Sequence, residues 1–535
     1  MTRNLAMSFE IIDKDLLGRI GRLYTSHGVI ETPAIAPVIN PAKMTISPDT
    51  IVRMGFKLIM TNAYIIWKRF GLLGVEMGVH GLLGVKTPIM TDSGAYQLME
   101  YGEVDIDPDS ILEYQEDIGS DIAVILDIPT RYNTPRDVVV EEVRETIDRA
   151  INAIKKRRRN DILLVAPIQG GIYYDVVEEC ARELAKYDFD VYAIGGPTQI
   201  MAMYKYNELV DLIMHAKMNI PPNKPVHLFG AGNPIMLPLA VALGVDLFDS
   251  AAYALYARDL RYMTSTAIIR FERLSYLPCN CPVCSKYSLD DLKSMPRREL
   301  EQKIALHNLY VIKREIDVIR NRIREGSLWE YIELKARCHP RLMDALAEIG
   351  KYKDYIEKFD PVTKPNARGI FIYDILSYNR PEIVRFRKRL MSNLKLDENI
   401  TLLLLPETFE KPFHRSKYIV EIINMVRNCL NNEKIKVMIY CKGFGLIPLE
   451  IDELYPLSQY EATLNISLDE VSNITNFIIE YVVKHKKSIK TLAIVVDENR
   501  WPKIFYERLS EKLKNSVKIL FYRLSNSEGF IENIE

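Results

Sequence analysis

The sequence predicts an α/β protein whose first half folds as a (β/α)8 TIM barrel. Eight short apolar runs recur within residues 1–270, and most of them lack the polar–apolar alternation of half-exposed strands. Helical patterns separate several runs, as in residues 138–156, where five valines and isoleucines share one face. Parallel strands covered by helices explain this arrangement, and eight strands in about 250 residues close a barrel. An open, doubly wound sheet is the alternative.

The apolar runs are the predicted barrel strands: residues 32–38, 57–61, 88–91, 122–127, 163–168, 191–194, 226–230 and 245–249. Ahead of them, residues 18–24 alternate glycines with larger side chains and predict a small hairpin that caps one end. A helix is expected around residues 251–268 after the last strand. The catalytic barrel is therefore assigned to residues 1–270.

The remaining chain divides into two further regions. Residues 271–350 combine a cysteine cluster with long charged helices and are assigned to a zinc-binding subdomain. Residues 360–535 mix strands with helices and are assigned to a C-terminal α+β accessory region, which begins with a proline-containing linker at residues 361–366. The strands expected there are residues 368–374, 401–405, 436–440 and 492–496.

Composition and charge exclude several classes of protein. The 535 residues are 48% hydrophobic and 26% charged, which excludes disorder for most of the chain. The formal net charge is −1, so a polyanionic partner must be bound by local basic patches. Candidate patches are residues 155–159, 297–298 and 385–389. The amino-terminal residues lack the apolar core of a signal peptide and no 18-residue uncharged run follows, so a cytoplasmic protein without membrane contact is expected.

A cluster of metal-ligand residues follows the predicted barrel: Cys279, Cys281, Cys284 and, on the next helix, His307. The seven cysteines are few and odd in number, which in a reducing compartment argues against a disulfide framework. The Cys-x-Cys-x-x-Cys spacing, stiffened by two prolines, predicts one zinc ion per chain. Four protein ligands leave no open position, so this zinc is expected to be structural. Cys338 and His339 compete with His307 for the fourth position, and an iron–sulfur cluster is disfavoured.

Polar residues and glycines end six of the predicted strands. The candidate site residues are Asp92, Ser93, Tyr96, Asp127, Gln169, Gly195, Gly196 and Asp249. Each alone has a plainer reading: an aspartate caps the next helix, a Gly-Gly pair forms a turn, and Tyr96 packs in the core. Because the carboxyl ends of barrel strands face one mouth, these residues are instead expected to converge there.

Two carboxylates in one pocket allow a double displacement at an anomeric carbon. One attacks and forms a covalent glycosyl intermediate, while the other gives a proton to the leaving group and takes one from the incoming group. Glycines in the pocket wall let backbone N–H groups approach a flat heterocycle, on which Tyr96 can stack.

The motifs as an ordered set resemble those of the tRNA-guanine transglycosylases. They are Asp92-Ser93-Gly94-x-x-Gln97, Asp127-Ile128-Pro129, Gln169-Gly170, Gly195-Gly196, Asp249-Ser250-Ala251 and the cysteine–histidine set. The form of residues 248–254 and the long C-terminal extension resemble the archaeal branch, which serves archaeosine synthesis. The resemblance is dense over residues 8–345 and loose beyond them.

This resemblance implies a zinc-containing barrel that exchanges guanine at position 15 of tRNA for 7-cyano-7-deazaguanine (preQ0). By the same resemblance, Asp249 is the nucleophile on ribose C1′ and Asp92 is the general acid/base, although other assignments in the family give Asp92 the nucleophilic role. Asp127 would accept hydrogen bonds from the purine's N–H edge, while Gln169 and the Gly196 backbone read its carbonyl side. The implied partners are tRNA, preQ0 and guanine.

Several departures and alternatives accompany this resemblance. Ala95-Tyr96 stands where many members have Gly-Phe or Ser-Phe, and residues 520–535 show no recognisable PUA domain. A queuosine-type enzyme acting at the anticodon is the first alternative, although residues 197–199 do not resemble the matching stretch of those enzymes. A non-catalytic tRNA-binding subunit is the second, and an amidohydrolase-like barrel, which needs histidines at strand ends, is the weakest. A homodimer is also considered, with its contact in the zinc region.

Overall fold

The computed structural model describes residues 8–95, 106–366, 368–429, 434–524 and 531–534. The chain forms two compact units. The first comprises Met1–Tyr352 with Phe359–Asn366, and the second comprises Lys353–Lys358 with Ala367–Glu535. Among the residues described, no helix is both long and apolar enough to cross a membrane.

The first unit is built on a parallel sheet of eight strands in the order β4-β11-β10-β9-β8-β7-β6-β5. The strands are β4 (Ala34–Pro37), β5 (Ile59–Asn62), β6 (Ile89–Asp92), β7 (Ile122–Val124), β8 (Leu163–Ile168), β9 (Val191–Ile194), β10 (Val226–Leu228) and β11 (Leu247–Ser250). A parallel bridge between Val38 and Met60 joins the β4 end of the order to β5. The fold is therefore a nearly closed barrel, which confirms the prediction. Each of the eight predicted runs overlaps one of its strands, and β5, β6 and β11 end one residue beyond their runs.

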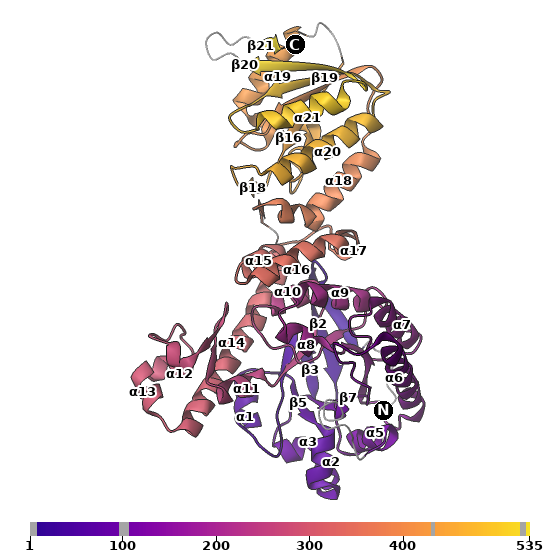
Figure 1. The fold of residues 1–535 in the computed structure, drawn as a ribbon, viewed down its shortest axis with the longest axis vertical. Helices are drawn as coiled ribbons and strands as arrows, with labels where there is room; N and C mark the ends of the chain where they lie inside the picture. The colour runs from indigo at the N-terminus through magenta and orange to yellow at the C-terminus, as the bar shows by residue number, and fades with distance from the viewer. Residues whose placement is uncertain (1–7, 96–105, 367, 430–433, 525–530, 535) are drawn as a thin grey trace. The chain divides into compact units, whose positions relative to one another are not determined.

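The strands read as continuous apolar runs because both of their faces are covered. Every residue of β8 is buried, between the barrel interior and the outer helices. These helices are α1 (Pro48–Arg53), α2 (Ala63–Phe70), α3 (Leu72–Leu83), α5 (Pro108–Asp117), α6 (Arg136–Lys156), α7 (Tyr174–Leu184), α8 (Pro197–Ala202), α9 (Tyr206–Lys217), α10 (Leu237–Ala242) and α11 (Ala252–Arg258). Figure 1 shows α5, α6 and α7 arranged around one side of the barrel.

An antiparallel meander caps the amino ends of the barrel strands. It consists of β1 (Phe9–Asp15), β2 (Gly18–Thr25) and β3 (Gly28–Glu31). Phe9, Leu23 and Ile30 belong to the same core as the inward side chains of the barrel. The predicted cap is present, but residues 18–24 form its central strand rather than a hairpin. Gly21 lets this strand pack closely, because a β-carbon there would lie 2.5 Å from the Phe9 ring.

The segment after the barrel differs from the predicted long helix. Helix α11 ends at Arg258, and a hairpin of β12 (Arg261–Met263) and β13 (Ile268–Arg270) follows. Leu260 has a φ of 51°, a left-handed conformation that breaks the helix before this hairpin. The remaining helices of this unit are α12 (Pro282–Lys286), α13 (Leu289–Ser294), α14 (Arg297–Glu325), α15 (Leu328–Ala336) and α16 (Pro340–Glu348), with α17 (Lys353–Phe359) at the division between units.

The second unit is a mixed α/β domain with its own apolar core. Its six-stranded sheet has the order β17-β16-β15-β19-β20-β21, in which the central four strands are parallel and the two edges antiparallel. The strands are β15 (Ile400–Pro406), β16 (Ile435–Cys441), β17 (Gly445–Pro448), β19 (Ile489–Val496), β20 (Lys518–Leu524) and β21 (Ile531–Ile534), beside the separate pair β14 (Ile370–Ile372) and β18 (Tyr460–Ala462). Its helices are α18 (Pro381–Asn393), α19 (Lys417–Cys429), α20 (Leu468–Lys484) and α21 (Lys503–Leu513).

Candidate active site and metal centre

Three aspartates converge at the carboxyl ends of the barrel strands. Asp92 is the last residue of β6, Asp249 is the penultimate residue of β11, and Asp127 follows β7 by three residues. The charges of Asp127 and Asp249 both act on Asp92, so all three carboxylates share one environment. Like charges held together away from water disfavour simultaneous ionisation. This arrangement suits a site in which one carboxyl carries a proton while another is charged.

Asp92 is oriented by Asn62, the last residue of the neighbouring strand β5. The Asn62 amide donates to Asp92 Oδ2 at 2.6 Å, and its own Oδ1 caps helix α2 by accepting the Ile65 N–H at 2.8 Å. Desolvation by the surrounding protein, followed by the charge of Asp127, raises the pKa of Asp92 to about 7. Asp92 can therefore gain and lose a proton near neutral pH, as a general acid/base must.

Asp249 is held by two donors on one carboxylate oxygen. Its Oδ1 accepts the Gly230 N–H at 2.9 Å and lies 2.8 Å from Nε2 of His227. His227 is fully buried within β10, where it pairs in register with the inward residues Ala193 and Leu247. Because these donors occupy Oδ1, the second oxygen of Asp249 remains available for attack on a substrate. Both donors stabilise the negative charge that a nucleophilic carboxylate carries.

Asp127 forms a pair with Gln169. The Gln169 amide donates to Asp127 Oδ2 at 2.5 Å, while its Oε1 accepts the Thr130 N–H at 3.2 Å, so the orientation of the amide is fixed. Burial raises the pKa of Asp127 to about 6, against the opposing effect of Gln169. Gly195 is required beside this pair, because a β-carbon there would lie 2.2 Å from Gln169 Nε2.

Three further residues were predicted to belong to the site: Gly196, Ser93 and Tyr96. Gly196 adopts a left-handed conformation with φ of 74° at the start of α8, which favours glycine at this turn. The Ser93 hydroxyl is buried next to Asp92 in the chain and has no hydrogen-bond partner among the described residues. It could therefore donate to a bound ligand. Tyr96, the predicted stacking residue, lies outside the described residues.

Asn62 and His227 were not singled out from the sequence. Asn62 directly follows the run 57–61, so its position after a strand is the same signal that selected Asp92. His227 lies inside the run 226–230, and a polar residue within an otherwise apolar strand is the sequence signal that could have identified it. Functional histidines of a barrel are expected at strand ends, whereas His227 lies within β10.

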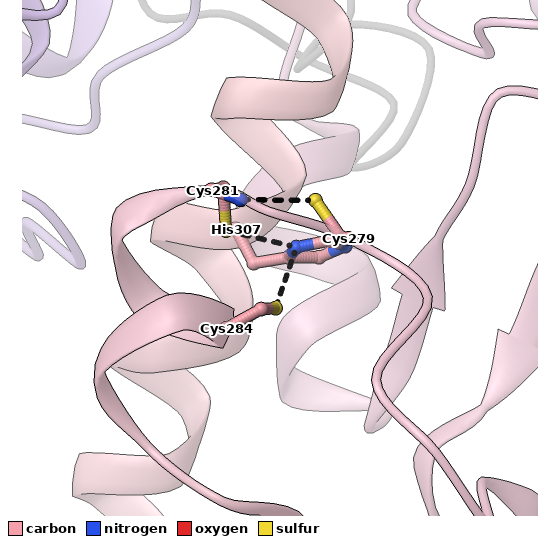
Figure 2. Close-up of side chains that lie close together, drawn as sticks. All are labelled: Cys279, Cys281, Cys284 and His307. Carbon is pink, nitrogen blue, oxygen red and sulfur yellow. Dashed lines mark hydrogen bonds between the residues drawn. The ribbon is translucent and has the colours of Figure 1, made fainter.

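The cysteine–histidine set forms a compact cluster, drawn in Figure 2. One ligand atom from each of Cys279, Cys281, Cys284 and His307 lies within 4.8 Å of all the others. The Cys281 and Cys284 sulfurs are 3.4 and 3.5 Å from His307 Nδ1, and the Cys281 N–H points to the Cys279 sulfur at 3.4 Å (Figure 2). Three sulfurs and one imidazole nitrogen are the donor set of closed structural zinc sites.

The surroundings of His307 turn its Nδ1 toward the three sulfurs. Its Nε2 lies 2.8 Å from the Met263 carbonyl, and its ring stacks on Tyr262 at 3.6 Å between centroids. A histidine ligand is commonly fixed in this way by a carbonyl at its other nitrogen. The competing residues lie elsewhere: Cys338 follows α15, and the His339 side chain caps α16. The structure thus selects His307 as the fourth member of the cluster.

Two of the three basic runs are largely engaged within the protein. In residues 155–159, Arg158 pairs with Glu116 and Asp117, and Arg159 pairs with Asp161. In residues 385–389, Arg385 pairs with Glu357 at 3.1 Å, and the Arg387 guanidinium lies over the Phe477 ring at 4.8 Å. These cations support the fold, which weakens their interpretation as a surface for RNA.

Comparison with known proteins relates the barrel and the second unit to different families. Residues 14–341 match the queuine tRNA-ribosyltransferase family, and residues 383–525 match a domain of unknown function. The chain is similar to a tRNA-guanine(15) transglycosylase of Pyrobaculum aerophilum, with 44% identity over 85% of this chain and 90% of that protein. The enzyme of the same name from Methanocaldococcus jannaschii is 43% identical over 90% of this chain and 72% of that protein. The Sulfolobus acidocaldarius enzyme is 40% identical over 91% and 95%.

Proposed function

The chain belongs to the queuine tRNA-ribosyltransferase family, and from this premise we propose that it is a tRNA-guanine(15) transglycosylase, a pentosyltransferase that exchanges guanine in tRNA for preQ0. The names of its relatives support the enzyme class and the position. The observation that carries the proposal is the convergence of Asp92, Asp127 and Asp249, with a pKa near 7 at Asp92. A module that only binds RNA gains nothing from buried carboxylates that repel one another.

In the first half-reaction, Asp249 attacks the ribose. Its free carboxylate oxygen bonds to C1′ as the bond from C1′ to N9 of guanine breaks, which leaves a ribosyl ester on Asp249. The bonds from Gly230 and His227 to Oδ1 support this assignment of the nucleophile. Protonated Asp92 supplies the proton that the departing guanine needs, which its raised pKa allows.

In the second half-reaction, the incoming base reverses these steps. Asp92, now ionised, takes the N9 proton of preQ0, and N9 attacks C1′ to release Asp249. Asp92 thus gives one proton to guanine and regains one from preQ0, so the two half-reactions balance and no other reactant is needed. The target base must leave the tRNA stack to reach the barrel mouth.

The Asp127–Gln169 pair recognises the base. A carboxylate at Asp127 accepts from the N–H edge of the purine, and Gln169 fixes the orientation of that carboxylate. Gln169 and the backbone of Gly196 face the carbonyl side of the base in this proposal. The glycine at position 195 keeps this wall of the pocket free of a side chain.

The four-ligand cluster holds one zinc ion in this proposal, and the ion stabilises the fold of the segment between the barrel and α14. Metal analysis of the purified chain should find one zinc per molecule. Cys284→Ser should lose it, while Cys338→Ser, outside the cluster, should retain it. Equal zinc content in both variants would contradict the assignment.

The activity is tested with unmodified tRNA and radiolabelled preQ0. Wild-type protein should incorporate label, and mass spectrometry of the product should place it at position 15. Labelled preQ1 or queuine entering the anticodon would instead indicate the queuosine-type alternative. Binding of tRNA without incorporation of any base would indicate a non-catalytic subunit.

A further inference from the structure

The second unit contains a cavity at the carboxyl edge of its parallel strands. From β15 the chain crosses to β16 on one side, and β19 later pairs on the other side, so the strand order reverses between β15 and β19. Open α/β sheets bind ligands at such a reversal, beyond the carboxyl ends of the strands. A cavity of about 340 Å³ lies here, lined by residues that follow β15, β16 and β19, including Glu407, Phe409, Lys442, Arg500 and Trp501.

Three cations line this cavity: Lys411, Lys442 and Arg500. Burial lowers the pKa of Lys411 and of Lys442, and the charge of Arg500 acts in the same direction on Lys411. Of the two lining carboxylates, Glu407 is turned to internal partners, since it accepts the Tyr460 hydroxyl at 2.7 Å and the Lys442 N–H at 3.1 Å. Lys442 Nζ donates to the Thr463 carbonyl at 2.7 Å and lies 3.6 Å from Glu470, so Lys411 and Arg500 are the cations that can attract an anion.

An exposed aromatic ring stands beside these cations. Phe409 is 76% exposed, and the Arg500 guanidinium lies 3.9 Å from the centre of its ring. Arg500 is itself anchored, because Nη1 donates to the Glu407 carbonyl at 2.5 Å. An aromatic surface next to fixed positive charge binds a base by stacking and its phosphate by attraction.

We propose that this cavity binds a nucleotide, with the base against Phe409 and the phosphate between Lys411 and Arg500. The nucleotide is either a free mononucleotide or one nucleotide of a bound tRNA, since both offer the same chemistry. The inference concerns the second unit, which matches a domain of unknown function, and does not depend on catalysis by the barrel.

The test titrates AMP into the full-length chain by isothermal calorimetry. The variants are Phe409→Ala and Lys411→Met. The control is Lys503→Ala, which removes a side chain that is 79% exposed in the same unit and does not line the cavity. Each cavity variant should weaken AMP binding about tenfold, because Phe409→Ala removes the stacking ring and Lys411→Met removes a charge beside the phosphate. Lys503→Ala should bind AMP like wild type, and thermal unfolding should verify that all variants are folded.

Competition identifies the source of the nucleotide. If tRNA displaces AMP from wild type, the cavity takes a nucleotide of tRNA. If AMP stays bound, the ligand is a free mononucleotide. Two results overturn the proposal: no binding of AMP at millimolar concentration, or equal AMP affinity in Phe409→Ala, Lys411→Met and Lys503→Ala. The second result would mean that AMP binds elsewhere, for example at the barrel mouth.

Discussion

The two ends of the barrel use aspartate in opposite ways. At the amino end, an aspartate directly precedes each of β7, β9 and β11 and accepts a backbone N–H from the strand before it. The pairs are Asp121 with Ile89, Asp190 with Leu164 and Asp246 with Val226, at 2.8, 3.1 and 2.8 Å. At the carboxyl end, the charges of Asp127 and Asp249 act on Asp92 instead.

The difference lies in the number of donors around each carboxylate. Although burial opposes ionisation, the neighbouring His80 ring, the Ile89 N–H and the His27 ring hold the pKa of Asp121 below its usual value. Asp92 has fewer donors and two like charges nearby, and its pKa rises to about 7. The aspartates at the amino end are thus bonded into the scaffold, whereas Asp92 keeps a raised pKa at a cost in stability.

The largest expected effect is on catalysis at the carboxyl end. Asp249→Asn removes the nucleophile but keeps the size of the side chain, so incorporation of preQ0 should fall roughly 10⁴-fold or more. The free energy of unfolding should change little. Incorporation assays and urea unfolding measure the two quantities separately. Wild-type activity in this variant would remove Asp249 from the reaction.

At the amino end, Asp246→Asn should act on stability instead. Asp246 is fully buried and receives bonds from the Arg19 guanidinium and the Val226 N–H. Leaving Arg19 buried without its charged partner should cost about 3–5 kcal/mol in the free energy of unfolding. Asp188→Asn is the matched control, because that aspartate is 94% exposed in its pair with Lys224. If the folded Asp246 variant lost catalysis while keeping its stability, the comparison between the two ends would fail.

The third prediction concerns His227 as a positioning residue for Asp249. Its bond to the carboxylate is worth about 1.5–3 kcal/mol, so His227→Leu should lower kcat roughly ten- to hundredfold. KM for tRNA should stay near the wild-type value, since His227 is fully buried. His227→Gln keeps an N–H donor and should recover part of the rate. Equal rates in the two variants would point to a packing role alone.

The smallest effects should appear in the pH dependence of stability. The pKa of Asp92 is raised from 3.8 to about 7, so its contribution to stability is present below about pH 4 and is lost as the pH rises to about 7. Asp92→Asn should therefore gain stability over wild type as the pH increases through this window.

Asp121 should behave in the opposite way. Because the pKa of Asp121 is lowered in the folded protein, its contribution to stability is present above about pH 3.8. This contribution is lost as the pH falls through the folded pKa. Asp121→Asn should thus be most destabilised near neutral pH, and its deficit should shrink in acid. Urea unfolding at several pH values compares the two variants, and parallel curves would contradict the distinction.

The barrel strands were predictable because burial on both faces requires a continuous apolar run, as in residues 163–168. The cap was predicted with the wrong form, since the glycines of residues 18–24 serve close packing against Phe9 and not a turn. The helix after β11 was predicted too long, because nothing in its composition marks the left-handed backbone at Leu260.

The site was harder to separate from the scaffold. Asp92 and Asp249 were selected because they lie at the ends of strands. Asp121 and Asp246 are more deeply buried aspartates that precede strands instead, and the residue type alone does not separate the two pairs. The partners that orient the carboxylates come from other strands, so His227 could be recognised only once its neighbour Asp249 was placed. Contacts between residues far apart in the sequence cannot be predicted from spacing. The three cysteines of the metal cluster, by contrast, lie within six positions of one another, and their spacing predicts a metal site.

Helix α14 reaches from the metal cluster to the opposite end of the barrel. His307 lies in its first half, while Arg320 in its second half donates to the Pro33 carbonyl ahead of β4. Its 29 residues span roughly 43 Å as one continuous rod. A chelator acting at the cysteines would thus destabilise a helix that also contacts the backbone ahead of β4. The metal-binding segment and the barrel are therefore expected to unfold in a single cooperative transition.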